Sequence, residues 1–296
     1  MTKKVLFSAK QQRDVIRDVI TILEDSNEID LVYHDPLQDY YNLKQIGAPF
    51  KGVDYVIVKV ANENSIDLLH YAKLHQFRTL HDINTVLLCK NKVALDQAIR
   101  KVLECSPDLA SKFQMPDSWL QNINPRETFK EWTAPKLPIV LKSHYQHDKY
   151  MRFNFLVREL EDIDTFCSMY KQFLYYDLYV QKFIDCDGWD RKVYVIGDQV
   201  YGVIRENPIY KFIRENSKSI DTKELETERF EISKDIEQLA QALAKELGLK
   251  IFGFDLITPT KKDVFYLLDI NDFPGFSGVD EAQEMLVSFF IQELSP

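Results

Sequence analysis

The sequence has no hydrophobic run approaching the ~20 residues of a membrane-spanning helix, and the apolar stretch near its N-terminus is too short for a signal peptide. It also has no excess of basic residues. The net charge of -9 argues against broad nucleic-acid binding, which requires a basic face. The four cysteines include no closely spaced pair, which is typical of free thiols in a reducing compartment. We therefore expect a cytoplasmic protein that binds neither membranes nor nucleic acids.

The rest of the composition is that of a globular protein. Hydrophobic residues make up 45% of the 296 residues, and the mean hydropathy is -0.28. A chain of this length can bury a sizeable core spread over about two or three small units. The sequence contains no internal repeat and no long heptad pattern, so we expect a monomer.

The first part of the chain alternates short apolar segments with one amphipathic segment. Residues 5–8, 31–33 and 54–60 have the composition of strands, and residues 11–24 carry apolar side chains at helical spacing. This alternation predicts a small parallel sheet with helices packed on it.

The remainder predicts mixed α and β structure. In the middle of the chain we expect a helix at 94–103, an irregular segment at 107–125, a strand at 138–143, a helix at 162–174 and a strand at 178–184. Towards the C-terminus we expect a hairpin at 191–205 that turns at Gly197-Asp198, a charged loop at 211–229, a helix at 233–247 between Ser233 and Gly248, and two final strands.

The final strands carry a candidate metal site. Asp255 and Asp269 each end or interrupt an apolar segment, and Asn271 follows two residues later, so all three can project oxygens to one side of a paired sheet. Such ligands suit Mg²⁺, which completes its shell with water and phosphate oxygens. Asp-x-Asn before Phe-Pro-Gly is equally typical of a turn. Asp255, however, is flanked by large apolar residues, where a carboxylate is costly unless it is paired or metal-bound. The pattern therefore indicates an enzyme that handles a nucleoside triphosphate.

The order of the chemically informative residues resembles that of the ATP-grasp superfamily. These are Lys92, Lys142, the segment 181–184 and the three candidate metal ligands. The resemblance implies an α/β and α+β protein in which two lobes clamp ATP. It implies a small N-terminal parallel unit at 1–85, a first lobe at 86–183 and a second lobe with the metal site at 184–296. It further implies that Lys92 and Lys142 contact phosphates. The nucleotide would be bound by Gln181, Lys182, Phe183 and Ile184.

Within this superfamily the sequence resembles the inositol trisphosphate 5/6-kinases, also called inositol tetrakisphosphate 1-kinases. The likeness lies in residues 180–184, 191–197 and 269–279. It implies a kinase that uses ATP and Mg²⁺ to phosphorylate an inositol phosphate or similar small anion. The residues that it assigns to the substrate are Lys10, His147, Arg152, Lys192 and Gly275, with Lys192 and Arg205 acting in catalysis. His147 lies five residues after Lys142, as the family spacing requires, and Arg152 replaces a second histidine.

Two departures from the family pattern leave other functions open. The loop at 148–151 contains no glycine, and Glu206 follows Arg205 where the family has proline. A Gly-poor loop approaches phosphates less easily. One alternative is an ATP-grasp ligase that joins a carboxylate to an amine through an acyl phosphate. Another is a nucleotide-binding module without catalytic activity.

Overall fold

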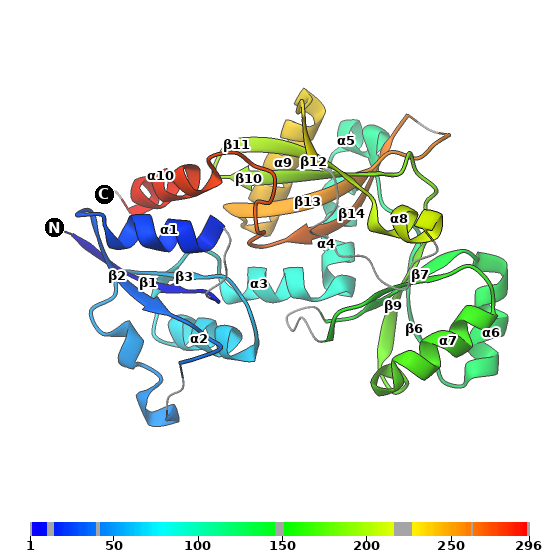
Figure 1. Cartoon of the computed structure of the whole chain (residues 1–296), viewed down its shortest axis with the longest axis horizontal. Coiled ribbons are helices and arrows are strands. Elements are labelled where there is room, and N and C mark those ends of the chain that lie inside the picture. The colour runs from blue at the N-terminus through cyan, green and yellow to red at the C-terminus, as the bar shows by residue number, and fades with distance from the viewer. Residues whose placement is uncertain are drawn as a thin grey trace.

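The computed structural model describes residues 2–10, 15–39, 42–145, 151–215, 227–261 and 263–294. Figure 1 shows that these residues form three regions, with the N-terminal sheet on one side, a six-stranded sheet in the middle and a four-stranded lobe on the other side. No helix in these ranges is both long and apolar enough to span a membrane.

The N-terminal sheet has the order β2-β1-β3-β4, and all its strand pairs are parallel, as the sequence predicts. Helices α1 and α10 cover one face and α2 lies on the other (Figure 1). The elements of this region are β1 Lys3–Ser8, α1 Val15–Glu24, β2 Ile29–His34, η1 Leu43–Gln45, η2 Ala48–Phe50, β3 Tyr55–Val58, α2 Glu63–Leu74, β4 Arg78–Thr79 and α3 Ile83–Lys90.

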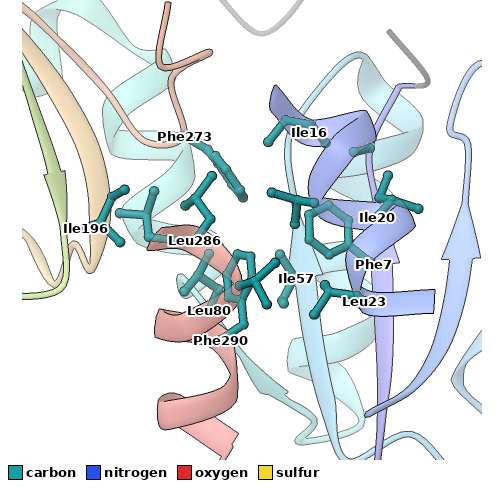
Figure 2. Packing of buried hydrophobic residues seen from close by; sticks show 14 of the residues in the cluster. Phe7, Ile16, Ile20, Leu23, Ile57, Leu80, Ile196, Phe273, Leu286 and Phe290 are labelled. Atoms are coloured by element: carbon teal, nitrogen blue, oxygen red, sulfur yellow. The ribbon is translucent and has the colours of Figure 1, made fainter. Parts of the chain in front are cut away.

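The last helix, α10 (Ala282–Leu294), belongs to the core of this first region. Figure 2 shows Leu286 and Phe290 of α10 facing the side chains of β1 and α1. The ring of Phe290 lies edge-on to that of Phe7, with centroids 5.8 Å apart. Each fully buried side chain of this size stabilises the fold by roughly 1.5–3 kcal/mol relative to exposure. The two ends of the chain are therefore held together by one hydrophobic cluster.

The four-stranded lobe has the order β6-β9-β7-β8 with antiparallel pairing throughout. Its elements are β6 Ser118–Asn122, α6 Arg126–Thr133, η3 Ala134–Lys136, β7 Ile139–Ser143, β8 Asn154–Val157, α7 Glu161–Met169, η5 Lys171–Phe173 and β9 Asp177–Lys182. The prediction of an irregular segment at 107–125 is wrong. This segment contains β6, which pairs with β9, and it also contains α5 (Pro107–Lys112) and β5 (Phe113–Gln114). Short strands of this kind form because distant partners supply their hydrogen bonds.

The six-stranded sheet has the order β12-β11-β10-β13-β14-β5. Its elements are β10 Trp189–Ile196, β11 Gln199–Glu206, α8 Pro208–Glu215, β12 Thr227–Phe230, α9 Lys234–Leu247, β13 Ile251–Ile257 and β14 Phe265–Asn271. Ser233 caps α9 and Gly248 ends it at a φ of 67°, as the sequence predicts. The predicted loop at 211–229 is wrong at both ends, where α8 and β12 lie. Residues 216–226 are outside the described ranges.

Helix α4 (Lys92–Glu104) packs on the six-stranded sheet. Its buried residues Leu95 and Ile99 share a hydrophobic cluster with Leu239 of α9 and Phe254 of β13. Strand β5, which follows α4 and α5, pairs in parallel with β14 at the edge of the same sheet. The segment before residue 115 therefore contacts the C-terminal part of the chain. The three domain ranges expected from the sequence stay predictions.

Candidate active site

The acidic residues of the last two strands lie on one face of the six-stranded sheet. Asp255 is the register partner of Asp269, and the register shifts directly after Asp255. Asn271 follows Asp269 at a spacing of two residues, so its amide points to the same side. On the opposite face, Phe254 is fully buried in the hydrophobic cluster beneath the sheet. The predicted shared side is confirmed, but both aspartates lie inside their strands rather than at the strand ends.

A lysine binds each of these two carboxylates. Lys192, opposite Asp255 on β10, places its Nζ 2.7 and 2.9 Å from the two carboxylate oxygens. Lys92, the first residue of α4, donates to Asp269 Oδ1, and 5% of the lysine side chain is exposed. Burial raises the pKa of Asp269, but the charges of Lys92 and Lys142 outweigh burial and hold this pKa below its usual value. Asp269 is therefore ionised at neutral pH, the state in which a carboxylate binds a cation.

Lys142, from the four-stranded lobe, lies near Lys92 and Asp269. It lies on β7, and its Nζ donates to Oε1 of Gln181 on β9 at 2.7 Å. Burial lowers the pKa of Lys142 to about 8, and the positive charge of Lys92 acts in the same direction. The negative charge of Asp269 opposes this shift. Two lysines from different regions of the fold, Lys92 and Lys142, thus lie close enough to one another and to Asp269 for their charges to interact.

Arg205 is anchored at the edge of this charged face. It lies opposite Asp190 in the β10–β11 pair, and its Nη2 is 3.2 Å from Asp190 Oδ2. Asn207 donates to the other oxygen of Asp190 at 2.5 Å. Burial raises the pKa of Asp190, and the charge of Asp255 adds to this rise. A role for Asp190 was not predicted from the sequence. The available signal was an acidic residue in the polar first half of a strand whose second half is apolar.

The segment between the two lobes has its own contacts. Lys182 donates from its Nζ to two consecutive backbone carbonyl oxygens just before β7, at 2.7 and 2.9 Å. The ring of Phe183 stacks on Tyr210 of α8 with centroids 6.0 Å apart. Ile184 is partly buried against a small cluster around Cys186. The predicted nucleotide-binding residues therefore lie where the four-stranded lobe meets the six-stranded sheet.

The carboxyl end of the N-terminal sheet faces the loop that follows β14. Phe7 of β1 contacts Phe273 edge-on, with ring centroids 6.5 Å apart. Lys59, directly after β3, donates to the carbonyl oxygens of Phe273 and of the next residue, at 2.6 and 2.7 Å. Lys10 follows β1 at the same sheet edge, and a Cβ added at Gly275 would have no neighbouring atom within 4 Å. The backbone N–H of Lys59 also donates to the carbonyl oxygen of Ser8 at 2.8 Å, so Lys59 links the segment before Lys10 to the segment before Gly275.

The remaining two predicted substrate residues follow β7. Arg152 is exposed and precedes β8. His147 lies outside the described residues. The spacing of His147 from Lys142 therefore remains a sequence prediction.

A buried ion pair also holds the loop that follows β14. Lys90, the last residue of α3, binds Asp272, and their side chains are 11% and 1% exposed. Burial raises the pKa of Asp272, but the charges of Lys90 and His81 bring it below its usual value. This pair was not predicted from the sequence. The two residues are 182 positions apart, so no local pattern links them.

Parts of the chain are similar in sequence to known proteins. Residues 208–292 match the family model described as inositol 1,3,4-trisphosphate 5/6-kinase ATP-grasp domain. Inositol-tetrakisphosphate 1-kinase 1 of Arabidopsis thaliana is 28% identical over 173 residues, covering 47% of this chain and 54% of that protein. Inositol-tetrakisphosphate 1-kinase 1 of Oryza sativa subsp. indica is 26% identical over 132 residues, covering 38% of this chain and 37% of that protein. The matches therefore span between about a third and about half of these relatives.

Solved structures match over nearly the whole chain. A ligase of the ATP-grasp type from Chryseobacterium gregarium, in complex with ADP and leader and core peptides, has a TM-score of 0.66 at 14% identity, covering 100% of this chain and 98% of that one. A RimK domain ATP-grasp protein from Sphaerobacter thermophilus has a TM-score of 0.68 at 15% identity, covering 97% and 98%. The ATP-grasp ligase PsnB, complexed with minimal precursor, Mg and ADP, has a TM-score of 0.62 at 14% identity, covering 97% of each chain. The chain therefore has the ATP-grasp fold. Its sequence is similar to the inositol trisphosphate 5/6-kinases.

Proposed function

We propose that this protein is a kinase that transfers the γ-phosphate of ATP to a hydroxyl of an inositol phosphate or a similar phosphorylated polyol. The observation that carries the proposal is the convergence of three lysines, Lys92, Lys142 and Lys192, on the two carboxylates of Asp255 and Asp269. Such a site offers cations to phosphates and anions to a metal. The sequence similarity to inositol kinases supports the choice of acceptor.

The residues present fit Mg²⁺. Two carboxylates on one sheet face, with the amide of Asn271 beside them, form the hard oxygen set that Mg²⁺ prefers when nucleotide phosphates complete its shell. Asp255, Asp269 and Asn271 would hold the ion, which when bound offsets negative charge on the phosphates. A similar fold binds ADP and Mg in the ligase PsnB, which supports this assignment.

The chain's own cations would bind and orient the two reactants. Lys92 and Lys142 would contact ATP phosphates, and Gln181, Lys182, Phe183 and Ile184 would form the nucleotide-binding segment. The residues that would orient the acceptor are Lys10, His147, Arg152, Lys192 and Gly275. The acceptor hydroxyl oxygen then forms a bond to the γ-phosphorus, the bond from this phosphorus to the β-phosphate oxygen breaks, ADP leaves and the hydroxyl proton is released to solvent. Positioning and electrostatics would supply most of the rate enhancement, with Lys192 and Arg205 facing the transferred group.

A second candidate is a ligase that phosphorylates a carboxylate and joins the acyl group to an amine. One observation favours it. Two of the three solved structures described above, which match nearly the whole chain, are ATP-grasp ligases.

Phosphate transfer from γ-labelled ATP, with Mg²⁺ and a panel of inositol phosphates, tests the proposal. Label on an inositol ring supports the kinase. Label released as inorganic phosphate only when both a carboxylate and an amine are supplied supports the ligase and overturns the kinase. The heat-denatured protein provides the background for both measurements.

A further inference from the structure

A buried chain of polar side chains leads from α4 to Lys142. Asp96 accepts a hydrogen bond from Arg100 Nε at 2.7 Å and one from the Tyr179 hydroxyl at 2.7 Å. Gln181 Nε2 donates to Tyr179 Oη at 3.1 Å, and Gln181 Oε1 accepts from Lys142 Nζ at 2.7 Å. Asp96, Tyr179 and Gln181 are 5%, 4% and 2% exposed. Water therefore has little access to these three side chains.

The chemistry of the groups fixes the direction of every hydrogen bond in the chain. An ionised carboxylate can only accept, so the Tyr179 hydroxyl donates to Asp96. Burial raises the pKa of Tyr179, with the charge of Asp96 acting the same way, so this hydroxyl keeps its proton. Its oxygen then accepts from the amide NH₂ of Gln181, which leaves the amide oxygen facing Lys142. Ser118 Oγ lies 2.8 Å from Tyr179 Oη, and the serine hydroxyl donates its proton to the carbonyl oxygen of Pro116 at 3.1 Å.

These hydrogen-bonded side chains also connect two regions of the fold. Helix α4 packs on the six-stranded sheet through Leu95 and Ile99. Tyr179 and Gln181 lie on β9 of the four-stranded lobe. Arg100 adds a second link, because its Nη2 donates to the carbonyl oxygen of Pro116 at 2.7 Å.

We propose that Asp96 and Tyr179 are positioning residues that orient the Gln181 amide, so that its oxygen holds the Lys142 ammonium where it meets the ATP phosphates. This inference rests on the proposed nucleotide role of Lys142. The amide of Gln181 has a donor end and an acceptor end of similar shape. Without a partner that accepts from the donor end, that end can turn towards the ammonium and repel it. Tyr179 supplies this partner, and Asp96 holds the tyrosine in the required orientation.

The test is the reactivity of Lys142 with acetic anhydride, followed by peptide mass spectrometry and expressed relative to the exposed Lys112 of the same molecule. In Tyr179→Phe we expect Lys142 to react on the order of tenfold faster, because a hydrogen bond to a charged group is lost. Asp96→Asn should change the rate in the same direction. Tyr201→Phe, which removes an exposed hydroxyl bonded to Gln199, should leave it unchanged.

A rescue variant distinguishes a change in the orientation of the Gln181 amide from a general loss of packing around Tyr179. Gln181→Glu has an accepting oxygen at both ends, so Tyr179→Phe/Gln181→Glu should return the Lys142 rate towards that of the wild type. Equal Lys142 rates in wild type and in Tyr179→Phe, with thermal unfolding curves that agree, would overturn the positioning role. Protection of Lys142 by ATP in the wild-type protein is a separate measurement. Its absence would count against the proposed function, whatever the tyrosine variant shows.

Discussion

Lys192 and Asp255 occupy opposite positions on neighbouring antiparallel strands, and the lysine Nζ lies within hydrogen-bonding distance of both carboxylate oxygens, at 2.7 and 2.9 Å. One of these residues is a predicted substrate ligand and the other a predicted metal ligand. Their contact places the two predicted sites side by side. Acceptor and metal–nucleotide would therefore meet at this pair, which is the arrangement that direct transfer of a phosphoryl group requires.

Replacing Lys192 by methionine should lower kcat by on the order of 10²-fold, because a cation facing the transferred phosphoryl group is lost. Steady-state kinetics with the acceptor found in the transfer assay gives kcat and KM separately. Lys245→Met, an exposed lysine of α9, is the control and should retain wild-type values. A kcat for Lys192→Met within about twofold of wild type would contradict a catalytic role for Lys192.

Replacing Asp269 by asparagine should reduce Mg²⁺-dependent turnover by at least about 10²-fold, since it removes a charged oxygen ligand and leaves Lys92 without its partner. Asp198→Asn alters an exposed residue of the hairpin turn and provides the control. The turnover of both variants is measured over a Mg²⁺ titration. Turnover of Asp269→Asn that is restored fully by excess Mg²⁺ supports a ligand role. Unchanged turnover at every concentration contradicts the metal assignment.

The pH dependence should report Lys142. Its pKa is lowered to about 8, chiefly by burial, so its ammonium is fully charged below that pH and loses its proton as the pH rises through it. Because the charged form binds phosphate, we expect kcat/KM for ATP to fall above pH 8, and this ratio follows ionisations of the free enzyme. In Lys142→Arg the guanidinium stays charged, so the fall near pH 8 should disappear. A decline of the same size in the arginine variant would assign the pH dependence to another group.

The buried pair of Lys90 and Asp272 should matter for stability. Lys90→Met leaves Asp272 buried without its charge partner, and we expect a loss of about 3–5 kcal/mol in the free energy of unfolding, measured with urea. Lys90→Met/Asp272→Leu removes both charges and should recover most of that loss. Lys73→Met breaks a pair whose side chains are 46% and 53% exposed, and it should cost less than about 1 kcal/mol. Equal losses in the Lys90 and Lys73 variants would show that burial does not decide the effect.

Local patterns predicted a large part of the fold. The α/β alternation of the first part, the hairpin that turns at Gly197 and the capped helix α9 are confirmed. Two segments were wrong. Residues 107–125 lack a strong period, and their short strands β5 and β6 depend on hydrogen bonds to β14 and β9. The first residues of the charged segment at 211–229 belong to α8 (Pro208–Glu215), and the ring of Tyr210 in this helix stacks on Phe183.

For the candidate site, the sequence by itself determined which side chains share a face. The period of a β-strand is two residues, so the spacing of Asp269 and Asn271 sets their side regardless of the rest of the chain. The sequence did not determine that Lys92 binds Asp269, that Lys90 binds Asp272, or that a buried tyrosine links α4 to Lys142. These contacts join residues far apart in the sequence. Only the tertiary structure decided them, because packing of α3 and α4 against the sheets brings charges of opposite sign together in places where water cannot solvate them.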